Sequence, residues 1–95
     1  MDDNPVLVRA YSAGVFAGFL VGKDGNEVTL RDARRIWKWS GATTLSQLAE
    51  EGPKNPDRCR FSQPVKRQTI KGWIEILDIT PAGWEAIRSV PDWKS

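Results

Sequence analysis

The chain contains no histidine and a single cysteine, Cys59. Histidine is the commonest general base and a frequent metal ligand, so its absence removes most acid–base and metal-dependent mechanisms. One thiol can neither close an intramolecular disulfide nor form a cysteine-based metal site by itself. These absences count against an enzyme, and we expect no metal and no cofactor.

The carboxylates are scattered and lack the spacing of an acid–base pair. Those outside the expected helices and the chain termini include Asp24, Asp32, Asp57, Glu75 and Asp78. Glu75 and Asp78 fall on opposite faces of a strand, so they cannot act together there. A glycine-rich phosphate loop of the P-loop kind is also missing. We therefore expect a binding protein and assign no catalytic residue.

Long apolar runs are absent as well. No stretch approaches the roughly 20 apolar residues that a membrane-spanning helix needs. Residues 1–5 are acidic and do not resemble the start of a signal peptide. Because a single cysteine also fits a reducing compartment, we expect a soluble cytoplasmic protein with no membrane partner. Cys59, between Arg58 and Arg60, is expected to be a half-buried residue at the start of a strand, with a reactive thiol as the alternative.

The chain is rich in tryptophan, and its middle part is rich in positive charge. Its 95 residues are enough for one small domain, spanning 1–95, and include five tryptophans. Residues 31–71 hold ten lysines or arginines and four acidic residues, whereas the remainder holds four cations and eight acidic residues. If the central cations gather on one side, their field favours an anionic partner; a mixed, solvated surface is the alternative.

The hydrophobic pattern predicts an α+β fold with a small antiparallel, barrel-like sheet of about five strands and two short helices. The expected strands cover residues 6–11, 14–21, 27–30, 33–39 and 73–79, and residues 65–71 form a polar strand or loop.

Turn and capping residues support this outline. Asp24-Gly25 is a strong hairpin signal, and Gly14 and Gly18 within an apolar strand predict a bend or a close backbone approach. Thr44 and Thr80 are expected to cap the two helices. Residues 53–64 are expected to form an exposed loop because they are rich in proline and polar residues.

Residues 33–41, Ala-Arg-Arg-Ile-Trp-Lys-Trp-Ser-Gly, combine two tryptophans with three cations. We expect a strand here, because aromatic and β-branched residues lie at the end of the segment. Alternation then places Ala33, Arg35, Trp37 and Trp39 on one face, and Arg34, Ile36 and Lys38 on the other. We expect Trp37 in the core and Trp39 more exposed at the end of the strand. The alternative is that both indoles are core residues, with the arginine stem packed along them.

This segment and the loop after it supply the candidate ligand-binding residues. Arginine and lysine side chains would hold phosphate groups, while an aromatic ring would stack on a base. The candidates are Arg34, Arg35, Lys38, Trp39, Tyr11, Arg58 and Arg60.

Several segments resemble an uncharacterised family of small tailed-bacteriophage proteins, whose pattern begins with Tyr-Ser-Ala-Gly-Val and centres on Ala-Arg-Arg-Ile-Trp-Tyr-Trp. The matching segments are residues 8–18, 25–30, 33–42, 45–49 and 75–77. Lys38 stands where that pattern has an aromatic residue, which makes this face more basic here. The resemblance implies a small phage accessory protein of the host bacterial cytoplasm, and it brings no established site residues.

In that context we expect one of two alternative binding functions. In the first, the protein is a non-catalytic counter-defence protein that sequesters an anionic nucleotide second messenger, as a sponge, or binds nucleic acid. In the second, it is a protein–protein inhibitor that docks on a host defence or takeover target, since tryptophan and arginine favour interface hot spots. Apolar residues on both faces of residues 15–21 also predict a homo-oligomer.

Overall fold

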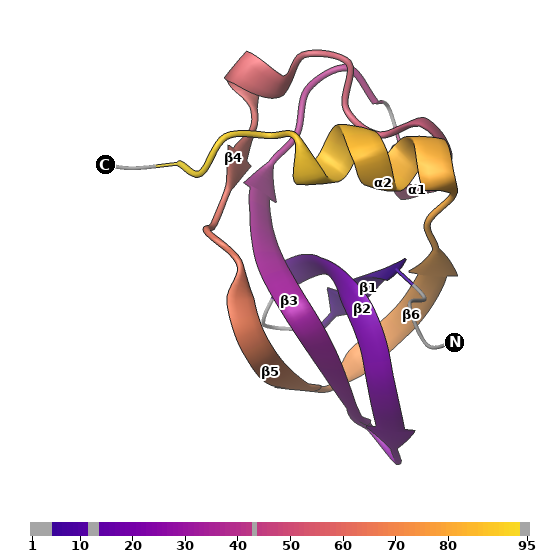
Figure 1. Ribbon diagram of the computed structural model, residues 1–95. Helices are drawn as coiled ribbons and strands as arrows, with labels where there is room; N and C mark the ends of the chain where they lie inside the picture. The colour runs from indigo at the N-terminus through magenta and orange to yellow at the C-terminus, as the bar shows by residue number, and fades with distance from the viewer. Residues whose placement is uncertain (1–4, 12–13, 43, 94–95) are drawn as a thin grey trace.

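The computed structural model describes residues 5–11, 14–42 and 44–93 (Figure 1). This part of the chain forms six strands, two α-helices and one short 3-10 turn. In chain order they are β1 (Pro5–Ala10), β2 (Gly14–Asp24), β3 (Glu27–Lys38), α1 (Leu45–Glu51), the turn η1 (Pro56–Arg58), β4 (Arg60–Phe61), β5 (Val65–Lys71), β6 (Trp73–Asp78) and α2 (Pro81–Arg88). The predicted α+β class is confirmed, with six strands in place of about five.

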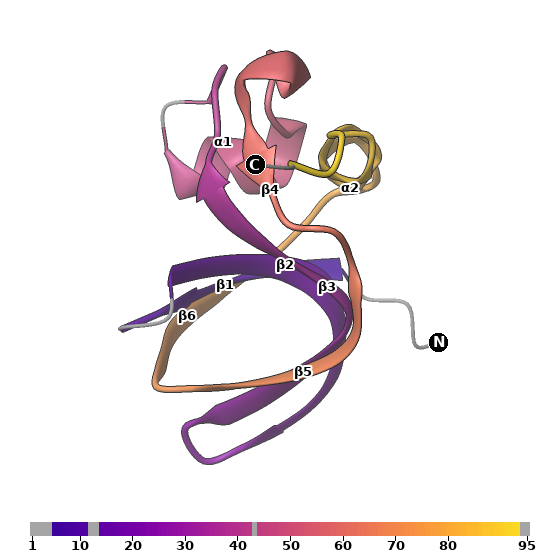
Figure 2. The same cartoon turned by 90° about the vertical axis from the view of Figure 1, so that its left-hand side faces the viewer.

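The strands form one antiparallel sheet in the order β4-β3-β2-β1-β6, and β5 also pairs with β3. β5 and β6 are separated by Gly72 alone, yet they pair with β3 and β1 respectively. The sheet therefore curls round on itself (Figure 2). No ladder between β5 and β6 closes the curl within the described strands, so "barrel-like" describes its curvature and not a closed barrel.

The pairing of β2 with β3 is irregular near Gly18 and Asp32. Asp32 on β3 has a φ of 53°, and the register between the two strands shifts at Gly18 on β2. A Cβ atom on Gly18 would lie 3.0 Å from the carbonyl oxygen of Arg31 and 3.1 Å from the Cα of Ala33. This confirms the close backbone approach predicted at Gly18, whereas a Cβ atom on Gly14 would meet no atom within 4 Å. The expected hairpin turn is also present, with Gly25 at a φ of 62°.

The curled sheet buries side chains on both faces. The core inside the curl includes Val6, Val8, Phe16, Leu30 and Ile70. The core on the opposite face includes Leu7, Ala17, Ile36, Leu48 and Ile87, and both helices lie on this side (Figures 1 and 2).

Neighbouring residues of β2 thus belong to different cores. Phe16 and Ala17 are both 0 % exposed, one inside the curl and the other beneath the helices. Phe16 and Ala17 are therefore covered from within the chain, whereas Val21 at the far end of the same apolar run is 48 % exposed. The homo-oligomer expected from this run stays a prediction.

Both helices begin at the predicted threonine caps. The Thr44 hydroxyl accepts a hydrogen bond from the Gln47 N–H (3.1 Å), and the Thr80 hydroxyl accepts one from the Gly83 N–H (2.9 Å). The Thr80 N–H in turn donates to the carbonyl of Ala49 (3.1 Å), which holds the start of α2 against α1. Neither described helix has the length and apolar character of a transmembrane span.

Candidate functional site

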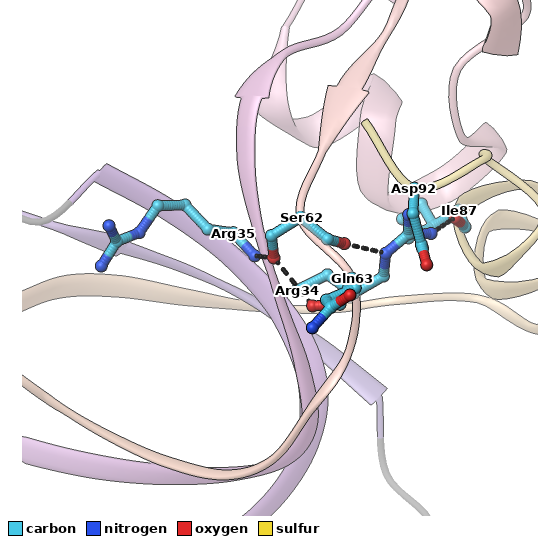
Figure 3. A network of polar contacts seen from close by, with 6 residues as sticks. All are labelled: Arg34, Arg35, Ser62, Gln63, Ile87 and Asp92. Carbon is cyan, nitrogen blue, oxygen red and sulfur yellow. Dashed lines mark hydrogen bonds and ion pairs between the residues drawn. The ribbon is translucent and has the colours of Figure 1, made fainter. Parts of the chain in front are cut away.

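Arg34 lies in the core, although we expected it to bind a ligand. Its side chain is 4 % exposed. Its Nε donates to the carbonyl of Ser62 (2.7 Å), Nη1 to the carbonyl of Ile87 (3.1 Å) and Nη2 to the carboxylate of Asp92 (3.2 Å) (Figure 3). Burial lowers the pKa of Arg34, and the Asp92 carboxylate acts in the opposite direction. Strand parity could not reveal this burial, because the covering groups are 28 to 58 residues away in the sequence.

The contacts of Arg34 also hold the segment that follows α2. Asp92 forms a parallel bridge with Phe61 of β4, and the Trp93 N–H donates to the Phe61 carbonyl (2.9 Å). The end of the chain is thereby placed beside β4, whose other residue is Arg60. This arrangement brings Trp93 to the same surface as the end of β3.

Trp37 and Trp93 form an exposed pair of indoles, which we call the aromatic pair. Their ring centroids are 5.8 Å apart at an interplanar angle of 70°, an edge-to-face contact. Trp37 is 53 % exposed and Trp93 is 42 % exposed. The guanidinium of Arg60 lies over the Trp93 ring at 5.0 Å. Large aromatic rings left in solvent beside a cation are characteristic of binding surfaces.

The burial that we expected for Trp37 and Trp39 is reversed in the structure. Trp39 is half-buried against the core beneath the helices, whereas Trp37 is exposed. The reason is an irregularity opposite β4, where Ile36 and Lys38 pair with adjacent residues of that strand. β3 therefore has one residue too many between the two pairs, and such a bulge breaks the alternation of side chains. Beyond the bulge, Trp39 turns to the same core as Ile36.

A mostly cationic hollow of about 260 Å³ lies on one side of the aromatic pair. Its lining, which we call the basic pocket, consists of Lys38, Asp57, Arg58, Cys59, Arg60 and Trp93. Three of the predicted ligand-binding cations therefore meet here, from the end of β3, from η1 and from β4. Three positive charges against one carboxylate make this pocket attractive to anions.

The loop that carries Arg58 is fastened to the residue after Trp39. The Asn55 N–H donates to the Ser40 carbonyl (3.2 Å), and the Asn55 side-chain amide donates to the Ser40 hydroxyl (3.2 Å). The Ser40 N–H donates to the sulfur of Cys59 (3.3 Å), and that thiol donates to the Asn55 carbonyl (3.4 Å). Cys59 is 7 % exposed. It is therefore a packed residue just before β4, more buried than expected, and its thiol joins the loop to Ser40, beyond the end of β3.

A second hollow of about 210 Å³ lies on the other side of the aromatic pair. Its lining, which we call the Arg35 hollow, consists of Arg35, Trp37, Ser62, Val65 and Gln68. Figure 3 shows Arg35 and Arg34 pointing to opposite sides of β3, which confirms their predicted separation. The Arg35 guanidinium lies over the Phe16 ring at 4.9 Å, and its buried Nε has no hydrogen-bond partner. A buried N–H donor without a partner is an exception among protein polar groups.

Tyr11 and Trp39, the two predicted stacking residues, line neither hollow. Tyr11 is 86 % exposed, and its N–H donates to the carbonyl of Gly72 (2.9 Å), where β5 passes into β6. Sequence reasoning missed Trp93; the only signal is a tryptophan beyond Pro91, outside any expected element. In the part of the chain that the structure describes, no three histidine, cysteine or acidic side chains gather as metal ligands.

Comparison with known proteins gives one match. The sequence model of the domain of unknown function DUF6948 matches residues 3–87. That range contains Arg35, Trp37 and every cation of the basic pocket, whereas Trp93 lies beyond it. Searches of curated proteins and of solved structures find no match. Because the matched range spans most of the chain, the protein belongs to the DUF6948 family.

Proposed function

We propose that the protein binds a phosphate-bearing nucleotide ligand, free or within a nucleic acid, and that it acts by binding and not by catalysis. The observation that carries the proposal is the exposed aromatic pair beside the basic pocket. Lys38, Arg58 and Arg60 are suited to hold phosphate through charge-assisted hydrogen bonds. An exposed indole provides a face on which a base can stack.

In this proposal the protein is a small phage accessory protein of the host bacterial cytoplasm. It acts in counter-defence, either by sequestering a nucleotide second messenger or by binding nucleic acid. The support is the resemblance to small tailed-phage proteins, together with the cationic site. Sequestration requires affinity and abundance but no chemical step, which suits a small domain whose site consists of binding groups.

A protein partner is the second candidate. Tryptophan and arginine dominate interface hot spots, and Val65, which is 44 % exposed, extends the apolar surface beside Trp37. In this version the protein is an inhibitor that docks on a host defence or takeover target and meets an acidic surface with its basic pocket. The homo-oligomer is proposed under either version.

Removing one cation from the basic pocket should distinguish binding there from general charge attraction. Arg58→Ala should weaken nucleotide binding roughly tenfold, because a charge-assisted phosphate contact is lost. Lys66→Ala is the matched control, since Lys66 is an exposed cation of β5 that lines neither hollow. The measurement is titration with ATP, a cyclic dinucleotide and oligothymidylate, followed by calorimetry and tryptophan fluorescence at two salt concentrations.

The proposal is overturned if none of these ligands produces heat or a fluorescence change at low salt. Equal losses in Arg58→Ala and Lys66→Ala would also count against a defined pocket. A host protein that co-purifies with the wild type, but not with Arg58→Ala or Trp37→Ala, would favour the protein-docking version.

A further inference from the structure

The aromatic pair stands between two separate hollows, each of which contains arginine. We infer that the ligand is a single-stranded nucleic acid segment that crosses the aromatic pair, with one phosphate in the basic pocket and another at Arg35. This inference rests on the proposed function and narrows its ligand class.

The first argument is the continuity of the surface. Trp93 lines the basic pocket, Trp37 lines the Arg35 hollow, and the two rings touch. Arg35, Trp37 and Lys38 also follow one another along the end of β3. A ligand that occupies both hollows is therefore expected to contact these two indoles, which are 53 % and 42 % exposed.

The second argument is that each hollow has its own positive charge. The basic pocket holds Lys38, Arg58 and Arg60. The Arg35 hollow holds one guanidinium whose Nε is buried and unpaired, and the rest of its lining carries no carboxylate. A guanidinium attracts a phosphate by its charge, and no carboxylate of this lining opposes that attraction.

The third argument concerns the ligand itself. A mononucleotide carries its phosphates on one side of its base, so it occupies one hollow. A nucleic acid strand has a phosphate on both sides of each internal nucleotide, and its unpaired bases are free to stack on aromatic side chains. Cations that track the backbone, combined with aromatic stacking, are the general form of single-strand recognition. In a duplex the bases are already stacked, so the indoles would have no free face to contact.

A length series tests the inference with defined probes: thymidine monophosphate, then oligothymidylates of increasing length, and a duplex containing the longest strand. Affinity should rise steeply up to the shortest oligomer that spans both hollows, and then change little. Gln68→Glu places a carboxylate in the Arg35 hollow with almost no change in shape. It should weaken oligomer binding roughly tenfold while leaving unchanged the binding of thymidine monophosphate, whose phosphate we place in the basic pocket with its three cations. For the oligomer, it should also reduce the slope of log affinity against log salt by about 0.7, the value for one phosphate contact on a single strand.

Gln63→Glu is the matched control, because Gln63 is exposed, lines neither hollow and points away from the Arg35 guanidinium in Figure 3. Equal affinity for the monophosphate and the longest oligomer would overturn the inference while leaving the proposed function intact. A duplex that binds as tightly as the single strand would overturn it too. If no probe binds, the inference and the proposed function both fail.

Discussion

At the scale of single residues, Arg34 links the core to the candidate site. Its three hydrogen bonds reach the connection between β4 and β5, the end of α2, and Asp92. Asp92 precedes Trp93, so the same guanidinium that stabilises the core also positions half of the aromatic pair. The cost of burying this charge is visible in the lowered pKa of Arg34.

Replacing Arg34 should therefore destabilise the fold as a whole. Arg34→Met should lower the free energy of unfolding by about 2–4 kcal/mol, because the carbonyls of Ser62 and Ile87 lose their donors in the core. Asp92→Asn should cost less than about 1 kcal/mol, since that side chain is 40 % exposed and an amide oxygen still accepts a hydrogen bond. Urea denaturation followed by circular dichroism provides both values. Similar, small losses in the two variants would contradict this account of Arg34.

At the scale of elements, β3 determines which predicted residues meet. Its alternation is interrupted at Asp32 and again at Trp37. The alternation of side chains correctly predicted that Arg34 and Arg35 lie on opposite faces of β3. It holds there because both residues lie between the two irregularities, where the strand is regular. It failed for Trp39, which lies beyond the second one. That bulge arises from pairing with β4, and the residues of β3 themselves contain no sign of it.

Features that depend on neighbouring residues were predictable, and features that depend on distant segments were not. The hairpin at Gly25 and the caps at Thr44 and Thr80 depend on neighbouring residues, so local sequence was sufficient. The exposure of Lys38, Arg58 and Arg60 was also predictable, because loops and strand ends keep charged residues accessible. The burial of Arg34 and the contribution of Trp93 depend on segments that are distant in the sequence. Local patterns carry no information about such packing.

The contact between β2 and β3 makes a prediction about glycine. Gly18→Ala should lower the free energy of unfolding by about 1–3 kcal/mol, because its Cβ would press on the backbone of Arg31 and Ala33. Gly22→Ala in the same strand is the control, since a Cβ there meets no atom within 4 Å. That variant should be neutral or more stable by up to about 1 kcal/mol. Equal thermal and urea stability of the two variants would show that the close approach at Gly18 is unimportant.

At the scale of the whole molecule, the candidate site includes one residue, Trp93, from beyond both cores. The two cores bury residues of the sheet, of both helices and of the loops between them, and they end at Val90. The segment after α2 then returns to β4, where Trp93 makes a backbone hydrogen bond and exposes much of its ring. Trp93 thus completes the site while adding little to the cores.

This separation predicts that binding can be lost without loss of the fold. Trp93→Ala keeps the backbone hydrogen bond to Phe61 and the Arg34–Asp92 pair, so the melting temperature should change little. Oligothymidylate binding should weaken at least tenfold, because stacking on one aromatic ring is worth roughly 1–3 kcal/mol per base. Trp93→Phe retains a ring and should give an intermediate affinity. Calorimetric titration and thermal melting of the same samples measure the affinity and the stability of each variant. If Trp93→Ala lost as much stability as Arg34→Met and kept full affinity, Trp93 would belong to the fold and not to the candidate site.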